Sequence, residues 1–401
     1  MLRSLFSGIT GLRAHQTMLD VTGNNIANVN TTGFKSSNVQ FQDTLSQVLS
    51  NAGAAQQGVG GTNPAQVGLG VKVAGISTNF QQGAAQLTNV STDMMINGDG
   101  FFVVASGGQQ AYTRNGSFSF DATGQLVSAD GALVQGWAAD ASGAIDVNGP
   151  LSDLRLPVST LMGAAGTTSA TYEGNLPSDA AVGTVLNRQI DVFDQAGTAR
   201  SLTLAFTKTA AGWDISGAVA GTTSAQTGSI EFATDGSISA LTLPTFPADA
   251  AAGLSAIDVD LTALTGYAAI ETVAASDQDG RAAGSLTSFE INGDGTVMGT
   301  FSNGLKQAVG RVALAAFSNP NGLSKAGGST YEATVNSGDA QIGTAGTGAR
   351  GSITGGALEM SNVDLSAEFT SLIVAQRGFQ ANSRIISTSD SVLEELVNLK
   401  R

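Results

Sequence analysis

Residues Asp364–Leu399 read DLSAEFTSLIVAQRGFQANSRIISTSDSVLEELVNL, and apolar side chains recur in this stretch every seven residues. A heptad repeat of this kind predicts a helix that packs lengthwise against a second helix. At 1.5 Å per residue such a helix would be about 55 Å long, which is too long for the inside of a compact domain. The repeat is formed by Leu365, Leu372, Phe379, Ile386 and Leu393.

The beginning of the chain carries the same repeat. Its apolar positions, also seven residues apart, are Leu5, Leu12, Leu19 and Ile26. We therefore predict that residues 1–30 and 361–401 form two helices that pair as a coiled coil and act as a self-assembly seam. Our hypothesis is that the paired ends become fully stable only when neighbouring copies cover them.

Composition places the rest of the chain among β-rich proteins. The chain has 401 residues, 52 glycines and only 12% charged residues, a pattern typical of short strands and tight turns. It has no cysteine, which excludes disulfides and thiolate metal sites. No apolar run is long enough for a membrane-spanning helix, and the first residues do not resemble a cleavable signal peptide. The net charge of −14 argues against nucleic-acid binding.

Strand patterns predict two β domains, the second inserted into the first. Residues 146–284 hold fifteen acidic and five basic residues and form the predicted outer domain. The sequence Ile-Asn-Gly-Asp-Gly occurs at 96–100 and again at 291–295, on both sides of this insert. We therefore predict an inner discontinuous β domain over 71–145 and 285–360, with residues 31–70 as a connector.

Local signals give further expectations. Both Asn-Gly-Asp-Gly sequences are interpreted as hairpin turns. Asp364 is interpreted as the N-cap of the last helix. Phe41–Leu45 is interpreted as a short helical turn. Gly346–Gly351 matches a dinucleotide-binding fingerprint by letter but lacks the flanking strand and helix, so we interpret it as a flexible connector.

The sequence offers little for catalysis. His15 is the single histidine and lies beside the predicted seam, where a structural role is favoured. The Asp- and Gly-rich turns lack the full ligand set of a calcium loop. We therefore expect no enzymatic activity, no metal and no cofactor.

Three stretches resemble the flagellar rod and hook axial proteins of bacteria. They are Gly23–Lys35, Tyr112–Val127 with its TRNGSF sequence, and Ser361–Asn382. The family motif within the first stretch comprises Asn25, Asn28, Asn30, Gly33, Phe34 and Lys35. The size of the insert favours the hook members of this family over the shorter rod members.

The resemblance implies a structural subunit that assembles into a curved tube outside the cell and transmits torque as a flexible joint. It implies that the paired ends line the tube and that the insert faces outward. Implied partners are other copies of the chain, rod proteins, hook-filament junction proteins, the hook cap and the flagellar type III export apparatus. Phe41 and Leu45 resemble an element that engages the export gate, although simple packing explains them equally well.

Three other functions remain open from the sequence. A distal rod protein would use the same ends to build a straight, rigid shaft. A β-rich extracellular adhesin with helical ends and a cell-wall hydrolase are the alternatives from other classes.

Overall fold

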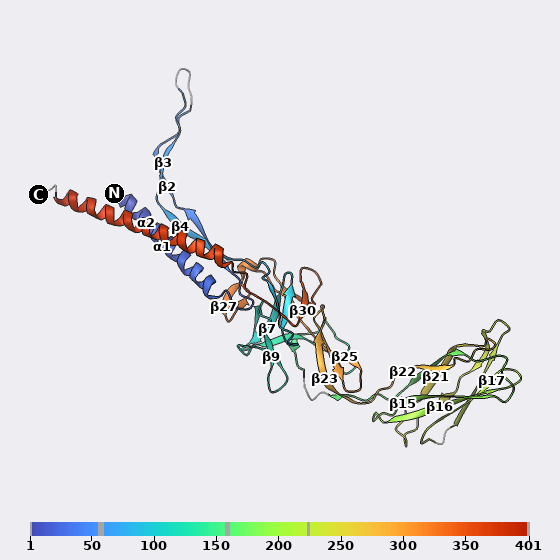
Figure 1. Cartoon of the computed structure of the whole chain (residues 1–401). Coiled ribbons are helices and arrows are strands. Elements are labelled where there is room, and N and C mark those ends of the chain that lie inside the picture. Colours follow the sequence, from blue (N-terminus) through green and yellow to red (C-terminus); the bar gives the residue numbers. More distant parts are fainter. Residues whose placement is uncertain (1, 55–59, 157–160, 223–224, 399–401) are drawn as a thin grey trace. The chain divides into compact units, whose positions relative to one another are not determined.

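The computed structural model of the chain describes residues 2–54, 60–156, 161–222 and 225–398 (Figure 1). It is mainly β, and its helices α1 (Leu2–Ala27) and α2 (Leu365–Asn398) stand near the two ends of the sequence and pack together. This confirms the predicted fold class. Within the described part of the chain, neither helix is apolar enough over a sufficient length to cross a membrane.

The chain divides into two compact units. Unit 1 comprises Met1–Leu156, Glu290–Met298 and Ala308–Arg401, and unit 2 comprises Pro157–Phe289 and Gly299–Gln307. The unit boundaries cut through β23 (Gly284–Ile291), β24 (Thr296–Phe301) and β25 (Lys306–Val312).

Unit 1 contains both helices and two groups of strands. The strands that precede unit 2 in the sequence are β1 (Ser37–Asp43), β2 (Ser46–Ser50), β3 (Ala65–Gly68), β4 (Val71–Thr78), β5 (Ala85–Leu87), β6 (Met94–Asn97), β7 (Phe101–Ser106), β8 (Gln109–Thr113), β9 (Phe118–Phe120), β10 (Leu126–Ser128), β11 (Leu133–Ala138) and β12 (Ser152–Asp153). Those that follow it are β26 (Leu314–Ala316), β27 (Ser324–Gly327), β28 (Thr330–Glu332), β29 (Gln341–Gly343), β30 (Ser352–Gly355) and β31 (Ala357–Glu359), with a 3₁₀ turn, η1, at Pro320–Gly322.

The segment expected as a connector is instead an antiparallel β ribbon. β1 pairs with β4, and β2 pairs with β3 farther along. The backbone N–H of Thr44 donates to the Gly70 carbonyl at 2.9 Å and so joins the two ladders. Phe41–Leu45 is therefore not a helical turn: Phe41 lies within β1, opposite Val73. Its neighbours in sequence are largely polar, so the strand carries a weak apolar alternation, which explains the wrong prediction.

The core of unit 1 is aromatic and combines strands from both groups. Phe101 on β7 lies edge-on to Phe80, Phe317 and Tyr331, with ring centroids 5.4, 5.8 and 5.8 Å away. Each of these edge-to-face pairs adds stabilisation beyond the burial of apolar area. Aromatic packing thus holds the two halves of unit 1 together.

Only one of the two Asn-Gly-Asp-Gly sequences is a hairpin turn. The second links the neighbouring strands β23 and β24. The first lies between β6 and β7, but β6 pairs with β30 and β7 pairs with β8, β11 and β26, so the predicted hairpin there is wrong. The local turn signal was correct, but the partner strand of β6 comes from about 250 residues later in the chain.

The predicted flexible connector at 346–351 is an ordered turn before β30. The Arg350 side chain donates from Nε to the Thr344 carbonyl at 3.1 Å and from Nη1 to the Gln341 carbonyl at 3.2 Å. These bonds hold the turn against β29.

Unit 2 is a sandwich of two sheets. The larger sheet has the order β15-β16-β17-β18-β19, and the smaller has the order β20-β21-β14-β22, with β14 and β21 parallel. Their inner faces share one core that includes Tyr172, Leu204, Trp213 and Leu261. The strands of the sandwich are β14 (Ser169–Asn175), β15 (Val185–Phe193), β16 (Ala199–Lys208), β17 (Trp213–Val219), β18 (Ala225–Phe232), β19 (Ile238–Thr242), β20 (Thr245–Phe246), β21 (Ile257–Thr265) and β22 (Ala274–Gln278). The short strand β13 (Leu161–Met162) pairs with β23 and lies in neither sheet.

Asp194 holds the turn between β15 and β16. Its Oδ1 accepts hydrogen bonds from the backbone N–H groups of Ala196 at 2.9 Å and Thr198 at 2.8 Å. The bond from the Thr198 backbone does most to hold the pKa of Asp194 below its usual range. The Thr198 side chain, the Ala196 N–H and the Arg200 charge add to it, and burial opposes it.

We expect Asp194→Ala to lower the unfolding temperature of unit 2 at pH 7. Because the pKa of this carboxylate is lower in the folded chain, its contribution is complete above about pH 4 and is lost as the pH falls through the folded pKa. The difference from the unmodified chain should therefore narrow in acid. Thermal unfolding of the full chain measures it, with Trp213 fluorescence in a Trp137→Phe background as the signal.

Asp191→Ala is the matched control, since Asp191 is an exposed carboxylate on the preceding strand. A difference for Asp194→Ala that stays constant with pH would contradict the role of the ionised side chain.

Candidate assembly site

The two terminal helices touch along a line of small residues. A Cβ atom added at Gly11 would lie 2.6 Å from the Asn382 Oδ1, and one added at Gly378 would lie 2.5 Å from His15 Cε1. Real Cβ atoms do not approach so closely, so a side chain at either position would displace Asn382 or His15, and glycine lets the helices come this near without that shift. Ala375, one turn before Gly378 on α2, is completely buried.

The predicted seam residues flank this line of closest contact. Gly8 illustrates the arrangement, since a Cβ added there would lie 3.3 Å from Cγ1 of Ile386. Leu365 and Phe379 stay 39% and 37% exposed. The other predicted seam residues are partly buried, namely Leu5, Leu12, Leu19, Ile26, Leu372, Ile386 and Leu393.

The start of α2 is fixed by its N-cap and by α1. The Asp364 Oδ1 accepts from the backbone N–H groups of Ser366 at 2.8 Å and Ala367 at 3.2 Å, which confirms the predicted N-cap. Glu368 in the first turn accepts from Asn25 Nδ2 at 2.9 Å. Asn25 also exchanges two hydrogen bonds with the Ser37 backbone. This motif asparagine therefore joins α1, α2 and β1.

Gly33 and Lys35 direct the chain from α1 into the β part of unit 1. Gly33 has a φ of +68°, and a Cβ there would lie 2.5 Å from the Asn115 backbone nitrogen. Its N–H donates to the Glu359 carbonyl at 2.8 Å. The close approach and the left-handed backbone both require glycine.

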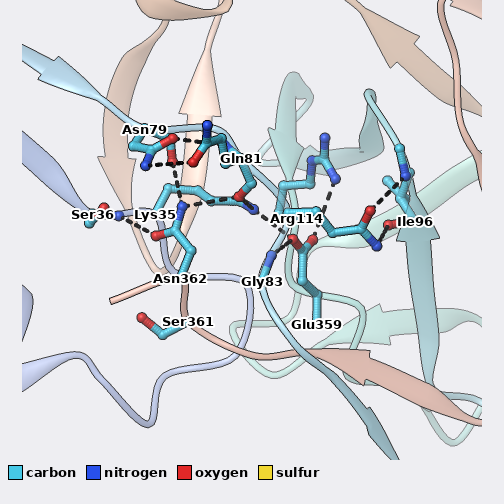
Figure 2. Close-up of polar contacts among 12 residues, drawn as sticks. Lys35, Ser36, Asn79, Gln81, Gly83, Ile96, Arg114, Glu359, Ser361 and Asn362 are labelled. Atoms are coloured by element: carbon cyan, nitrogen blue, oxygen red, sulfur yellow. Dashed lines mark hydrogen bonds and ion pairs between the residues drawn. The ribbon is translucent and has the colours of Figure 1, made fainter. Parts of the chain in front are cut away.

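Lys35 is at the centre of a buried polar junction, shown in Figure 2. Lys35 Nζ lies 2.6 Å from Glu359 Oε1 and donates to the Gln81 carbonyl at 2.7 Å. Arg114 Nη1 approaches the other carboxylate oxygen at 3.4 Å. The side chains of Lys35 and Glu359 are 0% exposed and that of Arg114 is 2% exposed. Such a pair is stable only because nearly all of its polar atoms find partners.

Asn362 extends the same junction to the start of α2. Its Oδ1 accepts from the Ser36 backbone N–H at 2.9 Å, and its Nδ2 donates to the carbonyls of Asn79 at 2.8 Å and Gln81 at 3.0 Å (Figure 2). The loop after α1, the segment before β5 and the segment before α2 therefore converge on a few polar side chains.

Burial determines the electrostatics of the junction. Desolvation lowers the pKa of Lys35, although the hydrogen bond and charge of Glu359 oppose the shift. Desolvation likewise lowers the pKa of Arg114, which also stands over the Phe101 ring at 5.4 Å. One carboxylate thus compensates two buried cations, and it comes from the opposite end of the sequence.

The remaining motif residues and the export-gate pair lie outside this junction. Asn28 Nδ2 donates to the Asn24 carbonyl at 2.9 Å, and Asn30 is exposed. Phe34 has Lys325 Nζ 5.4 Å above its ring. Phe41 and Leu45 are 40% and 83% exposed, and the Phe41 ring lies edge-on to His15.

Sequence reasoning missed Glu359 and the role of Arg114. Arg114 lies within Tyr112–Val127, one of the three stretches that resemble the axial proteins, but no neighbouring residue in the sequence indicates that it is buried. Glu359 is the last residue of the three-residue strand β31, which has no motif of its own. Among the described residues, no group of three or more His, Cys, Asp or Glu side chains is placed to hold a metal. The site can therefore join segments and position helices.

Four family models match the chain, and all describe flagellar proteins. "Flagella basal body rod protein" matches residues 5–35, and "Flagellar hook protein FlgE/F/G D1 domain" matches 95–185. "Flagellar basal body protein FlaE D2 domain" matches 167–281, and "Flagellar basal body rod FlgEFG protein C-terminal" matches 354–399. Together they define the class as rod and hook proteins of the bacterial flagellum.

Full-length relatives identify the family within this class. The chain is 38% identical to the flagellar hook protein FlgE of Borreliella burgdorferi, with 100% of both chains covered, and 36% identical to that of Escherichia coli, with 98% of both covered. It is 33% identical to the basal-body rod protein FlgG of Bacillus subtilis, with 100% of both covered. The chain belongs to the flagellar hook protein family.

A solved structure supports the fold. Helicobacter pylori flagellar hook protein FlgE2 aligns with a TM-score of 0.54 at 13% identity, over 69% of this chain and 99% of that one. At this identity the likeness concerns the fold alone.

We expect Glu359→Gln to destabilise unit 1 by about 3–5 kcal/mol, because it leaves two buried cations without a counter-charge. Urea unfolding of the full chain measures the loss. A combined Lys35→Met and Glu359→Gln variant should lose less than the sum of the single changes, since the two side chains interact directly.

Glu332→Gln is the control, because Glu332 is an exposed carboxylate on β28. If Glu359→Gln were as stable as this control, the junction would not hold unit 1 together.

Proposed function

We propose that the chain is the repeating subunit of the flagellar hook and has no catalytic role. The observation that carries this proposal is the pairing of two helices from opposite ends of the chain, in a protein similar to hook proteins over its full length. The paired helices are fixed to the β part of unit 1 through Lys35 and Glu359. Such a junction allows torque applied to the helices to reach the rest of the subunit without local hinging.

The proposed polymer is a curved tube that flexes while it transmits rotation. Strong contacts between helices would give it axial strength, and the predicted seam would lie at these contacts. Unit 2 would supply weaker outer contacts that rearrange at a cost of a few kcal/mol as the tube bends. Its acidic, well-solvated surface favours such weak contacts over permanent ones.

The proposed partners follow from the position of a hook in the flagellum. They are other copies of the chain, rod proteins below, hook-filament junction proteins above, the hook cap during growth and the type III export apparatus. The exposed side chains of Phe41 and Leu45 are available to the export gate before the subunit assembles.

A distal rod protein is the second candidate, because the FlgG relative is also similar over its full length. The hook relatives are more similar, which favours the hook. Electron microscopy of the polymer separates the two, since a rod would be straight and a hook curved.

We expect Leu372→Asp to block polymerisation while both units stay folded. The charge would have to be desolvated at the proposed contact between subunits, so the critical concentration should rise at least about tenfold. Sedimentation of polymer measures this, and circular dichroism checks the fold.

Thr370→Asp is the matched control, because Thr370 is exposed and lies on another side of α2. Normal assembly of Leu372→Asp would exclude this part of the helix from the subunit contact.

Removal of unit 2 tests the bending role. Met162 pairs with Gly284, one before and one after the sandwich strands of unit 2 in sequence, so residues 163–283 can be replaced by a short glycine linker. We expect the shortened chain to polymerise into straighter tubes, because the outer contacts are gone. Tubes of unchanged curvature in electron micrographs would exclude unit 2 as the source of bending.

A further inference from the structure

Helix α2 carries two separate apolar surfaces that the subunit itself does not cover. The first, the outer flank, consists of Leu365, Phe369 and Ile373, which are 39%, 52% and 55% exposed. These residues are four apart and follow one side of the helix. The small-residue line that contacts α1 lies on a different side, so the pairing of the two helices leaves this flank open.

The second surface is a groove where the distal half of α2 meets the start of α1. It has a volume of about 410 Å³ and is lined by Ser4, Arg384, Ile385, Thr388, Ser389 and Val392. Ile385 and Val392 are its apolar residues, 43% and 42% exposed. We call it the distal groove.

The two surfaces point in nearly opposite directions. At 100° per residue, the sixteen positions from Phe369 to Ile385 rotate the side chain by roughly 160°, and they advance it about 24 Å along the axis. One neighbouring molecule related by a twofold axis cannot cover both surfaces. Two different neighbours are required, one for each.

We propose that the outer flank of one subunit packs into the distal groove of the next, with an axial offset of about 24–30 Å. This inference rests on the proposed function, since it names the contact through which the helices polymerise. Each copy donates one flank and accepts another, so the contact is heterologous and continues into an open helical assembly. A second copy is the occupant, because the chain itself presents an apolar surface of matching length on the same helix.

The absence of cysteine from the sequence makes the contact directly testable. We would prepare full-length chains with Ile373→Cys, with Val392→Cys and with both, polymerise them and oxidise the polymer. We expect the double variant to give a ladder of covalent multimers on denaturing gels. An equal mixture of the single variants should give dimers only, and each single variant alone should give none.

Two outcomes would overturn the inference. Dimers from a single variant alone would indicate a twofold contact, and a double variant that stops at dimers would indicate a closed one. If the double variant fails to assemble, Leu365→Cys with Ile385→Cys provides a second pair across the same contact. Absence of a ladder from both pairs, in conditions where the unmodified chain polymerises, also overturns it.

A control keeps this result separate from the proposed function. Ala367→Cys with Val392→Cys should give no ladder, because Ala367 is exposed and lies about 160° around the helix from Phe369. If the unmodified chain forms no polymer under any condition, the proposed function fails and the inference fails with it. If tubes form but remain uncrosslinked, only the inference is lost.

Discussion

The architecture depends on one buried ion pair, Lys35 with Glu359, formed by residues 324 positions apart. Each charge costs several kcal/mol to remove from water, and only the presence of the other makes its burial tolerable. Arg114 adds a second cation from the β part of unit 1. The first helix, the last helix and the strands between them must therefore close on this point together.

The strand pairing also requires both ends of the chain to come together. β5 pairs with β31 and β6 with β30, so short strands near the beginning of the chain find their partners only near its end. The larger sheet of unit 2, by contrast, is built from strands that follow one another in sequence. Closure of unit 1 thus needs nearly the whole chain, whereas the sandwich has its own core.

The sequence allowed prediction of those features whose signals lie within a few neighbouring residues. Both helices, the N-cap at Asp364 and the β character of the insert were predictable, because their signals lie within a few neighbouring residues. The line of closest helix contact was not, since Gly11 and Gly378 carry no apolar signal. Glu359 was missed because burial of a charge depends on residues hundreds of positions away. The pairing of β1 with β4 was missed because β1 is mostly polar.

Small residues form the contact between α1 and α2, whereas large apolar residues beside that contact stay exposed. Glycine allows α1 and α2 to approach closely without using leucine or phenylalanine for the contact. Side chains such as Phe369 and Val392 then remain exposed, an arrangement that is costly for a lone subunit in water. In the proposed polymer, neighbouring copies that cover these side chains would offset this cost, so the stability of the helical ends would be coupled to growth of the polymer. Because Lys35 joins the loop after α1 to Glu359 and Gln81, a change at the helices would also affect the β part of unit 1.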